Sequence, residues 1–275
     1  MTLADLPPLR ESLEAHGLLA KKSLGQHFLL DLNITRKIAR LSGVGAGDLV
    51  IEVGPGPGGL TRALLETGAD VVAVEKDARF APLLQELAGA ADGRLRIELA
   101  DALAVDEAAL AGDRPAAVVS NLPYNVGTPL LVKWLTGPFT PTSLTLMFQK
   151  EVAQRIVAPP GASAYGRLAV LCQATARCEM VMDAPARAFT PPPKVDSAVV
   201  RLVPRGDRPR PALLDALQAV TQAAFGQRRK MLRSALKSLG GEALCAQAGI
   251  DPARRAETLG IEEFLRLAEA RLAIR

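Results

Sequence analysis

The chain has 275 residues, a length that suits one large domain or a large domain joined to a small one. Half of the residues are hydrophobic (49%) and 23% are charged, so the composition excludes an intrinsically disordered chain. The longest apolar runs are too short to cross a membrane, and the first residues lack the basic and then apolar pattern of a signal peptide. We therefore expect a cytoplasmic protein.

Three cysteines and two histidines offer few ligands for a metal. Cys172, Cys178 and Cys245 have neither the spacing of a zinc site nor that of a redox-active pair, and unpaired cysteines fit a reducing compartment. We expect no metal site.

The basic residues are concentrated near the C-terminus. Residues 198–275 hold 14 basic and 8 acidic residues, whereas the rest of the chain holds 19 basic and 21 acidic ones. A basic C-terminal part indicates a polyanionic partner such as a nucleic acid. A solvated helical surface produces the same bias, and the charge alone does not separate the two interpretations.

The N-terminal segment, residues 1–45, has a helical and basic pattern in which Asp31 would cap a helix that begins at Leu32. Short apolar strands then alternate with helices. The predicted strands are residues 49–53, 71–74, 95–99, 116–120 and 143–148, and the predicted helices are residues 60–67, 79–88 and 149–157. Such alternation predicts a mostly parallel sheet with helices on both faces.

Later strands are expected at residues 168–176, 178–182 and 198–203, after which a proline-containing connector (205–211) leads into a helical pattern. The expected C-terminal helices are residues 212–225, 227–239, 242–248 and 261–273. We therefore predict an α/β catalytic domain over residues 1–204 and a small, all-helical, basic domain over residues 205–275.

A glycine-rich loop follows the first predicted strand. Gly54, Gly56 and Gly59 match the spacing G-x-G-x-x-G, and Glu75 lies 21 residues after Gly54 at the end of the next strand. This pattern fits a nucleotide cofactor whose ribose hydroxyls bind the acidic side chain, although a purely structural glycine turn would also show it. The prolines at 55 and 57 remove backbone donors that a pyrophosphate would need, which favours S-adenosyl-L-methionine over a dinucleotide.

Asp101 follows the third predicted strand and could accept a hydrogen bond from the adenine amino group of that cofactor. A lone Asp in a loop more commonly caps a turn or a helix. Its place in an ordered set of polar residues at successive strand ends favours the ligand interpretation.

The fourth predicted strand ends in Asn121, Leu122, Pro123 and Tyr124. An exocyclic adenine amine is a poor nucleophile. An enzyme can activate it by accepting hydrogen bonds from both of its N–H groups. The Asn121 amide oxygen and the Leu122 carbonyl oxygen are suitable acceptors, and Pro123 would stiffen the turn between them. Tyr124 offers a face on which a flipped base can stack.

These motifs resemble the KsgA family of small-subunit ribosomal RNA adenine dimethyltransferases over nearly the whole chain. The matching stretches are KSLGQHFL (22–29), IEVGPG (51–56), NLPYN (121–125), FQKEV (148–152), YGR (165–167), FTPPPKVDS (189–197) and FGQRRK (225–230). The resemblance implies a Rossmann-like class I S-adenosylmethionine-dependent methyltransferase fold. It also implies dimethylation of two adjacent adenosines in the 3′-terminal hairpin loop of small-subunit ribosomal RNA, as part of ribosome biogenesis.

The resemblance further implies particular site residues. The implied cofactor contacts are His27, Leu29, Gly54, Glu75, Asp101 and Asn121, to which the glycine loop adds Gly56. Phe189, which precedes three prolines, would flank the target base opposite Tyr124. His27 stands where the family often has Asn.

Basic residues at two places are candidates for RNA binding: Lys21 and Lys22 near the N-terminus, and Arg228, Arg229, Lys230 and Arg233 in the predicted helix 227–239. On a continuous helix, Arg229, Arg233 and Lys237 would form one row that could follow an RNA backbone. The expected partner is small-subunit ribosomal RNA within the assembling subunit, and we expect a monomer that binds no membrane.

Three alternatives stay open at this point. A relative that methylates large-subunit ribosomal RNA shares the cofactor and tetrapeptide motifs but differs in its helical tail. A ribosome-assembly or transcription factor could keep the fold without turnover, against which the intact sequence from Asn121 to Tyr124 argues. A nicotinamide-dependent dehydrogenase is the most distant of the three.

Overall fold

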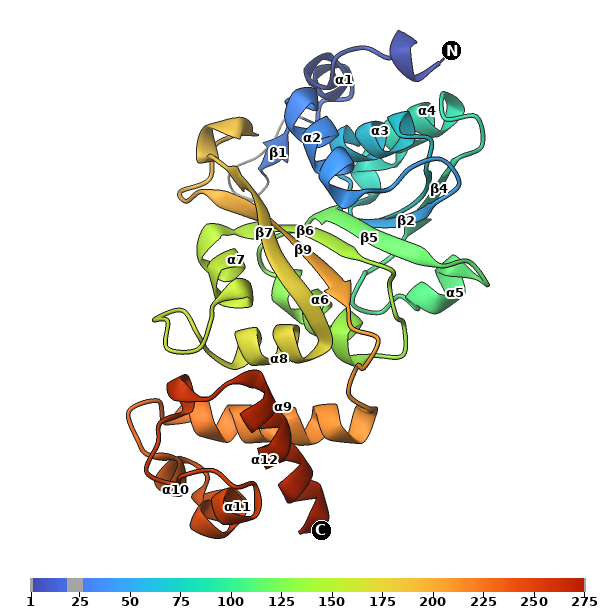
Figure 1. Ribbon diagram of the computed structural model, residues 1–275. Coiled ribbons are helices and arrows are strands. Elements are labelled where there is room, and N and C mark those ends of the chain that lie inside the picture. Colours follow the sequence, from blue (N-terminus) through green and yellow to red (C-terminus); the bar gives the residue numbers. More distant parts are fainter. Residues whose placement is uncertain (1, 19–26, 275) are drawn as a thin grey trace. The chain divides into compact units, whose positions relative to one another are not determined.

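The computed structural model describes residues 2–18 and 27–274 (Figure 1). The chain forms two compact units, of which the first comprises Met1–Trp134, Pro138–Ala153 and Met180–Arg201, and the second Leu135–Gly137, Gln154–Glu179 and Leu202–Arg275. Residues 154–179 precede the predicted boundary at residue 204 and yet pack with the C-terminal helices, which no sequence pattern indicated. The division of roles at residue 204 stays a prediction.

A seven-stranded sheet has the strand order β4-β3-β2-β5-β6-β9-β7. Its strands are β2 (Leu49–Val53), β3 (Asp70–Glu75), β4 (Leu95–Leu99), β5 (Ala116–Asn121), β6 (Leu144–Gln149), β7 (Ala176–Ala184) and β9 (Ser197–Pro204). The pairs β2–β3, β3–β4, β2–β5 and β5–β6 are parallel, with Ile51 opposite both Val72 and Val118. The predicted parallel sheet is confirmed.

The described residues form twelve α-helices, which alternate with these strands as expected only up to residue 157. They are α1 (Leu9–Ala15), α2 (Leu32–Ser42), α3 (Gly59–Glu66), α4 (Ala81–Gly89), α5 (Glu107–Ala111), α6 (Gly127–Thr136), α7 (Lys150–Val157), α8 (Arg167–Thr175), α9 (Pro211–Gly226), α10 (Leu232–Ala235), α11 (Gly241–Gln247) and α12 (Ile261–Ala273). Asp31 caps α2, since its carboxylate accepts the Asn33 backbone N–H at 2.8 Å. Among the described residues, no helix has the length and apolar character that a membrane span requires.

The core of the first unit lies between the sheet and helices α2 and α3, which pack side by side (Figure 1). Ile38 of α2 and Leu64 of α3 meet Val50 and Val71 of the central strands, and all four side chains are almost completely buried. Strand β2 is buried along its whole length, as its mostly apolar sequence predicts. This rigid sheet carries the loops described below.

The predicted strand over residues 168–176 is wrong, because Arg167–Thr175 forms helix α8. Its central residues Ala169, Val170, Leu171 and Cys172 are all buried. A short continuous apolar run has no periodicity that distinguishes a strand from a buried helix, and the packing in the second unit selects the helix.

The predicted helix over residues 227–239 is also wrong. Residues 227–230 form turns, Met231 pairs with Arg255 in an isolated bridge, and α10 spans only Leu232–Ala235. The backbone N–H of Leu232 donates to the Arg254 carbonyl oxygen at 2.8 Å, so pairing with a distant segment replaces a helical hydrogen bond. The basic row expected on this helix therefore does not form as one helical face.

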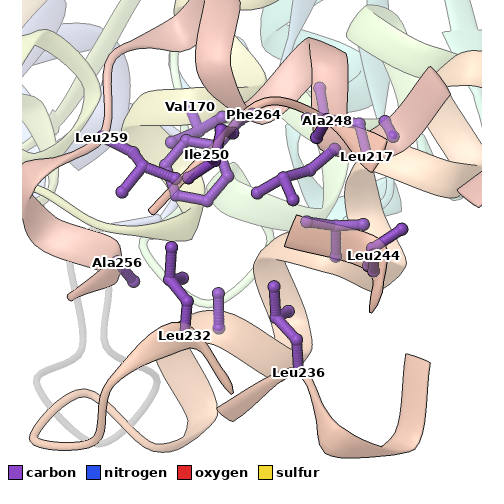
Figure 2. Close-up of a cluster of buried hydrophobic side chains, with 14 of the residues drawn as sticks. Val170, Leu217, Leu232, Leu236, Leu244, Ala248, Ile250, Ala256, Leu259 and Phe264 are labelled. Carbon is purple, nitrogen blue, oxygen red and sulfur yellow. The ribbon is translucent and has the colours of Figure 1, made fainter. Parts of the chain in front are cut away.

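A second core holds the helical unit together (Figure 2). Leu217, Leu232, Leu244 and Phe264 come from four different helices and are fully buried. The ring of Phe264 also stacks on that of Phe225, with centroids 5.5 Å apart and an interplanar angle of 29°. These contacts make Phe264 a central element of this unit.

We expect Phe264→Ala to lower the free energy of unfolding by about 3–5 kcal/mol, because it removes a buried ring and leaves a cavity. Urea denaturation followed by circular dichroism measures the loss. Phe264→Leu, which keeps most of the apolar volume, serves as the control and should lose clearly less. A loss below about 1 kcal/mol in Phe264→Ala would contradict the burial of this ring.

Candidate active site

The first unit contains a cavity of about 450 Å³ at the edge of the sheet where β2, β3 and β5 end. The glycine loop after β2, Glu75 at the end of β3 and the residues that follow β5 all line it. Ten of the residues predicted from the sequence lie in its wall: His27, Leu29, Gly54, Gly56, Glu75, Asn121, Leu122, Pro123, Tyr124 and Phe189. The carboxyl edge of a parallel sheet is where such folds bind ligands.

The glycine loop packs directly against the tetrapeptide. The hydroxyl of Ser120 on β5 donates to the Val53 carbonyl oxygen on β2 at 2.5 Å, which ties the two strand ends together. Gly54 has φ +68°, and a Cβ there would lie 3.2 Å from Cδ of Pro123. A larger residue at 54 would therefore be strained and would push the tetrapeptide away.

Glu75 is oriented before any ligand binds. Its side chain is buried, and its two carboxylate oxygens accept the backbone N–H groups of Gly56 at 3.0 Å and Asp77 at 2.8 Å. Burial raises the pKa of Glu75, and the hydrogen bonds from Asp77 and Gly56 oppose that shift. Each oxygen keeps a lone pair, so the carboxylate can still accept the hydroxyl groups of a ribose.

Glu52 is a site residue that the sequence analysis did not assign. It lies on β2, lines the cavity and is only 2% exposed, and within the described residues its Oε2 atom has no hydrogen-bond partner. Burial raises the pKa of Glu52 to about 8, and the charge of Glu75 adds to the shift. The carboxyl group inside the otherwise apolar strand LVIEV is the feature that could have revealed this residue. Burying such a group without a hydrogen-bond partner costs free energy, so its presence there indicates a functional role.

The acidic and glycine-lined wall fits S-adenosylmethionine, a cation with a ribose. Glu52 offers a carboxyl oxygen that has no partner among the described residues, and Glu75 offers acceptors to the ribose. At Gly59, a Cβ would lie 2.9 Å from the Leu29 carbonyl oxygen, so the loop and the chain around Leu29 already pack as closely as glycine allows.

A short two-stranded sheet joins the opposite wall of the cavity. Strand β1 (Phe28–Leu29) pairs antiparallel with β8 (Phe189–Thr190), which places Leu29 opposite Phe189. One ring nitrogen of His27, Nδ1, lies 2.8 Å from the Pro191 carbonyl oxygen. This pairing brings Phe189 to the cavity, although its position in the chain is remote from every other lining residue.

Tyr124 stands beside Asn121 in the cavity wall and is half-buried. Its hydroxyl lies 2.9 Å from Oγ of Ser197, and its ring centroid lies 6.2 Å from that of His27. Burial raises the pKa of Tyr124, so the hydroxyl is neutral at physiological pH.

Asp101 does not line the cavity. Its carboxylate pairs with Nζ of Lys76 at 2.8 Å and accepts the Leu103 backbone N–H at 3.0 Å, which is the turn-capping role that its sequence context allowed. The hydrogen bond from Lys76 lowers the pKa of Asp101. A contact between Asp101 and the adenine of a cofactor stays a prediction.

Of the candidates for RNA binding, Lys21 and Lys22 lie outside the described residues. Arg228 in the second unit pairs with Glu257 at 2.9 Å and donates to the Ser163 carbonyl oxygen, so part of its role is structural. The other three candidates, Arg229, Lys230 and Arg233, are exposed.

Over residues 2–18 and 27–274, no three His, Cys, Asp or Glu side chains gather in a way that could hold a metal ion.

The strand order, the glycine loop and the acidic cavity wall define a class I S-adenosylmethionine-dependent methyltransferase. The chain is similar to the crystal structure of a dimethyladenosine transferase from Plasmodium falciparum, with 25% identity, a TM-score of 0.74 and coverage of 88% of this chain and 96% of that chain. It is also similar to the 23S rRNA methyltransferase ErmE, with 28% identity, a TM-score of 0.66 and coverage of 88% and 98%.

The family model described as ribosomal RNA adenine dimethylase matches residues 17–271, and the chain belongs to this family. Two relatives carry the name ribosomal RNA small subunit methyltransferase A. The protein from Phenylobacterium zucineum is 73% identical, with 100% of this chain and 96% of the relative covered. The protein from Caulobacter vibrioides is 67% identical, with 92% and 98% covered. The resemblance inferred from the sequence motifs is confirmed.

We expect Glu75→Ala to weaken the binding of S-adenosylmethionine by about 10–150-fold, because charge-assisted hydrogen bonds to the ribose are lost. Isothermal titration calorimetry measures the affinity. Glu98→Ala is a matched control, since Glu98 lies on the neighbouring strand β4 and does not line the cavity. Unchanged affinity in a folded Glu75→Ala variant would remove Glu75 from the site.

Glu52 should make the folded protein less stable as the pH rises. Its pKa is about 8 in the folded chain against 4.5 as the ordinary value, so the folded state retains a proton that the unfolded state has lost between these two values. The contribution of Glu52 to the free energy of unfolding is therefore fully present below about pH 4.5 and is lost as the pH rises through 8.

The variant Glu52→Gln cannot ionise. Its free energy of unfolding relative to that of the wild type should therefore rise between pH 5 and pH 8, by about 2–5 kcal/mol. Urea denaturation without cofactor at the two pH values measures this difference. An equal difference at both values would show that Glu52 does not hold its proton in the folded protein.

Proposed function

We propose that this protein transfers methyl groups from S-adenosylmethionine to the exocyclic amines of two adjacent adenosines in the 3′-terminal hairpin loop of small-subunit ribosomal RNA. The observation that carries the proposal is the single cavity that Gly54, Gly56 and Glu75 share with Asn121 and Tyr124. The family description names ribosomal RNA adenine, which supports the class of target. The names of the relatives refer to the small ribosomal subunit, which supports this choice of RNA.

The cofactor, when bound, supplies an electrophilic methyl group. The residues of this chain bind and orient it. Gly56 and Asp77 hold the Glu75 carboxylate, which would accept the ribose hydroxyls. Glu52, whose Oε2 atom has no partner among the described residues, would lie beside the cofactor in the same cavity. The glycine loop leaves room for the cofactor beside the tetrapeptide, which is where the target base must enter.

The residues after β5 prepare the adenine amine. The Asn121 amide oxygen and the Leu122 carbonyl oxygen accept hydrogen bonds from the two N–H groups of the amine. These bonds favour a pyramidal nitrogen, whose lone pair can attack the methyl group. Pro123 packs closely against Gly54 and fixes the turn that separates these acceptors. Tyr124 and Phe189 line the same cavity and flank the flipped base.

The exposed basic residues Arg229, Lys230 and Arg233 of the second unit are proposed contacts to RNA phosphates. Lys21 and Lys22 are proposed for the same role near the N-terminus. In this proposal residues 205–275 bind RNA and residues 1–204 carry out catalysis. The protein acts as a cytoplasmic monomer on the assembling small subunit.

A large-subunit substrate is the second candidate, because ErmE is a 23S rRNA methyltransferase. Identity of 28% to that protein, against 73% and 67% to the small-subunit relatives, favours the small-subunit RNA. A factor that binds RNA without turnover is tested by the same experiment as the main proposal.

The test is incubation with labelled S-adenosylmethionine and, in separate reactions, unmethylated small ribosomal subunits and isolated large-subunit RNA, followed by primer extension to map the modified bases. We expect two adjacent dimethylated adenosines in the 3′-terminal hairpin. Label on isolated large-subunit RNA alone, or no label at all, would contradict the proposal.

In the same assay Asn121→Ala should lower the single-turnover rate on the order of 10²–10³-fold, because it removes an acceptor that acts in the transition state. Some loss of cofactor affinity is also expected, since Asn121 lines the shared cavity. Asn33→Ala is the control, because Asn33 is an exposed residue of α2 outside the cavity. An Asn121→Ala variant with more than half of the wild-type rate would refute the catalytic role.

A further inference from the structure

Tyr124 needs a fixed ring plane if a base is to stack on it in a defined position. The residue lies in the turn after β5, where the backbone N–H groups of Val126 and Gly127 both donate to the Pro123 carbonyl oxygen. These bonds fix the backbone, but they leave the side-chain torsions of Tyr124 free. A second contact is required to hold the ring.

That contact comes from Ser197, 73 residues further along the chain. Its hydroxyl oxygen lies 2.9 Å from the Tyr124 hydroxyl oxygen. Ser197 is the first residue of β9, which lies between β6 and β7 in the sheet, and it is completely buried.

The residue before Ser197 is anchored on two sides. The backbone carbonyl of Asp196 accepts the Lys150 N–H at 2.9 Å, and its carboxylate accepts the Ala186 N–H at 2.8 Å. The position of the Ser197 hydroxyl is therefore set by the sheet and its flanking loop. A rigid partner of this kind can define the orientation of a neighbouring ring.

The segment from Phe189 to Ser197 orients further groups of the cavity. Phe189 is itself buried in the cavity wall, and the Pro191 carbonyl oxygen holds His27 at 2.8 Å. The rings of His27 and Tyr124 are tilted by only 30° relative to each other. The segment from Phe189 to Ser197 thus orients three rings. It contains the ring of Phe189, and it contacts His27 and Tyr124 through hydrogen bonds.

We propose that Ser197 is a positioning residue for methyl transfer, which holds the Tyr124 hydroxyl and so sets the plane on which the target adenine stacks. The inference builds on the proposed function, because it assigns Tyr124 to the base. It also gives the Tyr124 hydroxyl an orienting role in place of proton transfer. Because burial raises the pKa of Tyr124, the neutral hydroxyl can take part in this bond at working pH.

The sequence permits a direct spectroscopic test, since the chain has only two tyrosines, Tyr124 and Tyr165. In protein labelled with 3-fluorotyrosine, Tyr124→Phe identifies the fluorine signal of each residue. Ser197→Ala should shift or broaden the Tyr124 signal. It should leave the Tyr165 signal in place, because the Tyr165 hydroxyl donates to the Leu259 carbonyl oxygen in the other unit.

Ser42→Ala is the matched control. Ser42 is also a buried serine, and its hydroxyl donates to the Ala39 carbonyl oxygen at 2.6 Å in helix α2, outside the cavity. Its removal deletes a buried hydroxyl without touching Tyr124. Both fluorine signals and the methylation rate should stay as in the wild type.

Kinetics supply the second measurement. Ser197→Ala should lower the single-turnover methylation rate at saturating RNA by about 3–10-fold, the usual worth of one neutral hydrogen bond, with cofactor affinity unchanged. Tyr124→Phe, which removes the other partner, should cause the same loss. The double variant should lose no more than either single variant, because both delete one interaction.

An unchanged Tyr124 fluorine signal in Ser197→Ala would overturn the proposal, and so would rate losses that multiply in the double variant. If the wild type transfers no methyl group to small-subunit RNA, the proposed function fails. The fluorine spectra still show in that case whether Ser197 holds the ring, so the two failures are distinguishable.

Discussion

The parallel pairing of β2 with β5 is the constraint on which the site depends. The chain builds β3 and β4 on one side of β2 and then returns to place β5 and β6 on the other. At such a reversal the loops after the two central strands diverge and leave room for ligands. The bond from Ser120 to Val53 then ties the two strand ends together, and Gly54 lies so close to Pro123 that a side chain at residue 54 would not fit between them. The glycine loop and the tetrapeptide line one cavity for this reason.

Most of the parallel sheet and of the cavity wall is predictable from the sequence, because the information is local. An apolar strand, a glycine turn and an acidic residue after the next strand occur in the order that a nucleotide cofactor requires, which identified Gly54 and Glu75. Asn121 and Tyr124 follow from the same logic at a later strand end. Asn121 and Tyr124 lie close to Gly54 and Glu75 because of the strand order, which the family resemblance implied.

Other features depend on contacts between distant parts of the chain. Helix α8 replaces an expected strand because the packing of its apolar residues decides between two structures that share one pattern. Residues 227–230 form turns because the segment that follows pairs with residues near Arg254. Ser197 shows no local sign of its contact with Tyr124. Glu52 is different, because a carboxyl group within the otherwise apolar strand LVIEV is itself a local sign of a buried ionisable residue.

We propose that the cofactor and the target adenine occupy adjacent parts of one cavity and that the adenine stacks on Tyr124. The most direct test is calorimetry with a bisubstrate analogue in which adenosine is joined through its N6 atom to the homocysteine part of S-adenosylhomocysteine. The analogue should bind the wild type at least about 10-fold more tightly than S-adenosylhomocysteine does, and Tyr124→Ala should remove that gain without changing the affinity for S-adenosylhomocysteine. Equal affinities of the two ligands for the wild type, or a gain that survives in Tyr124→Ala, would contradict the claim.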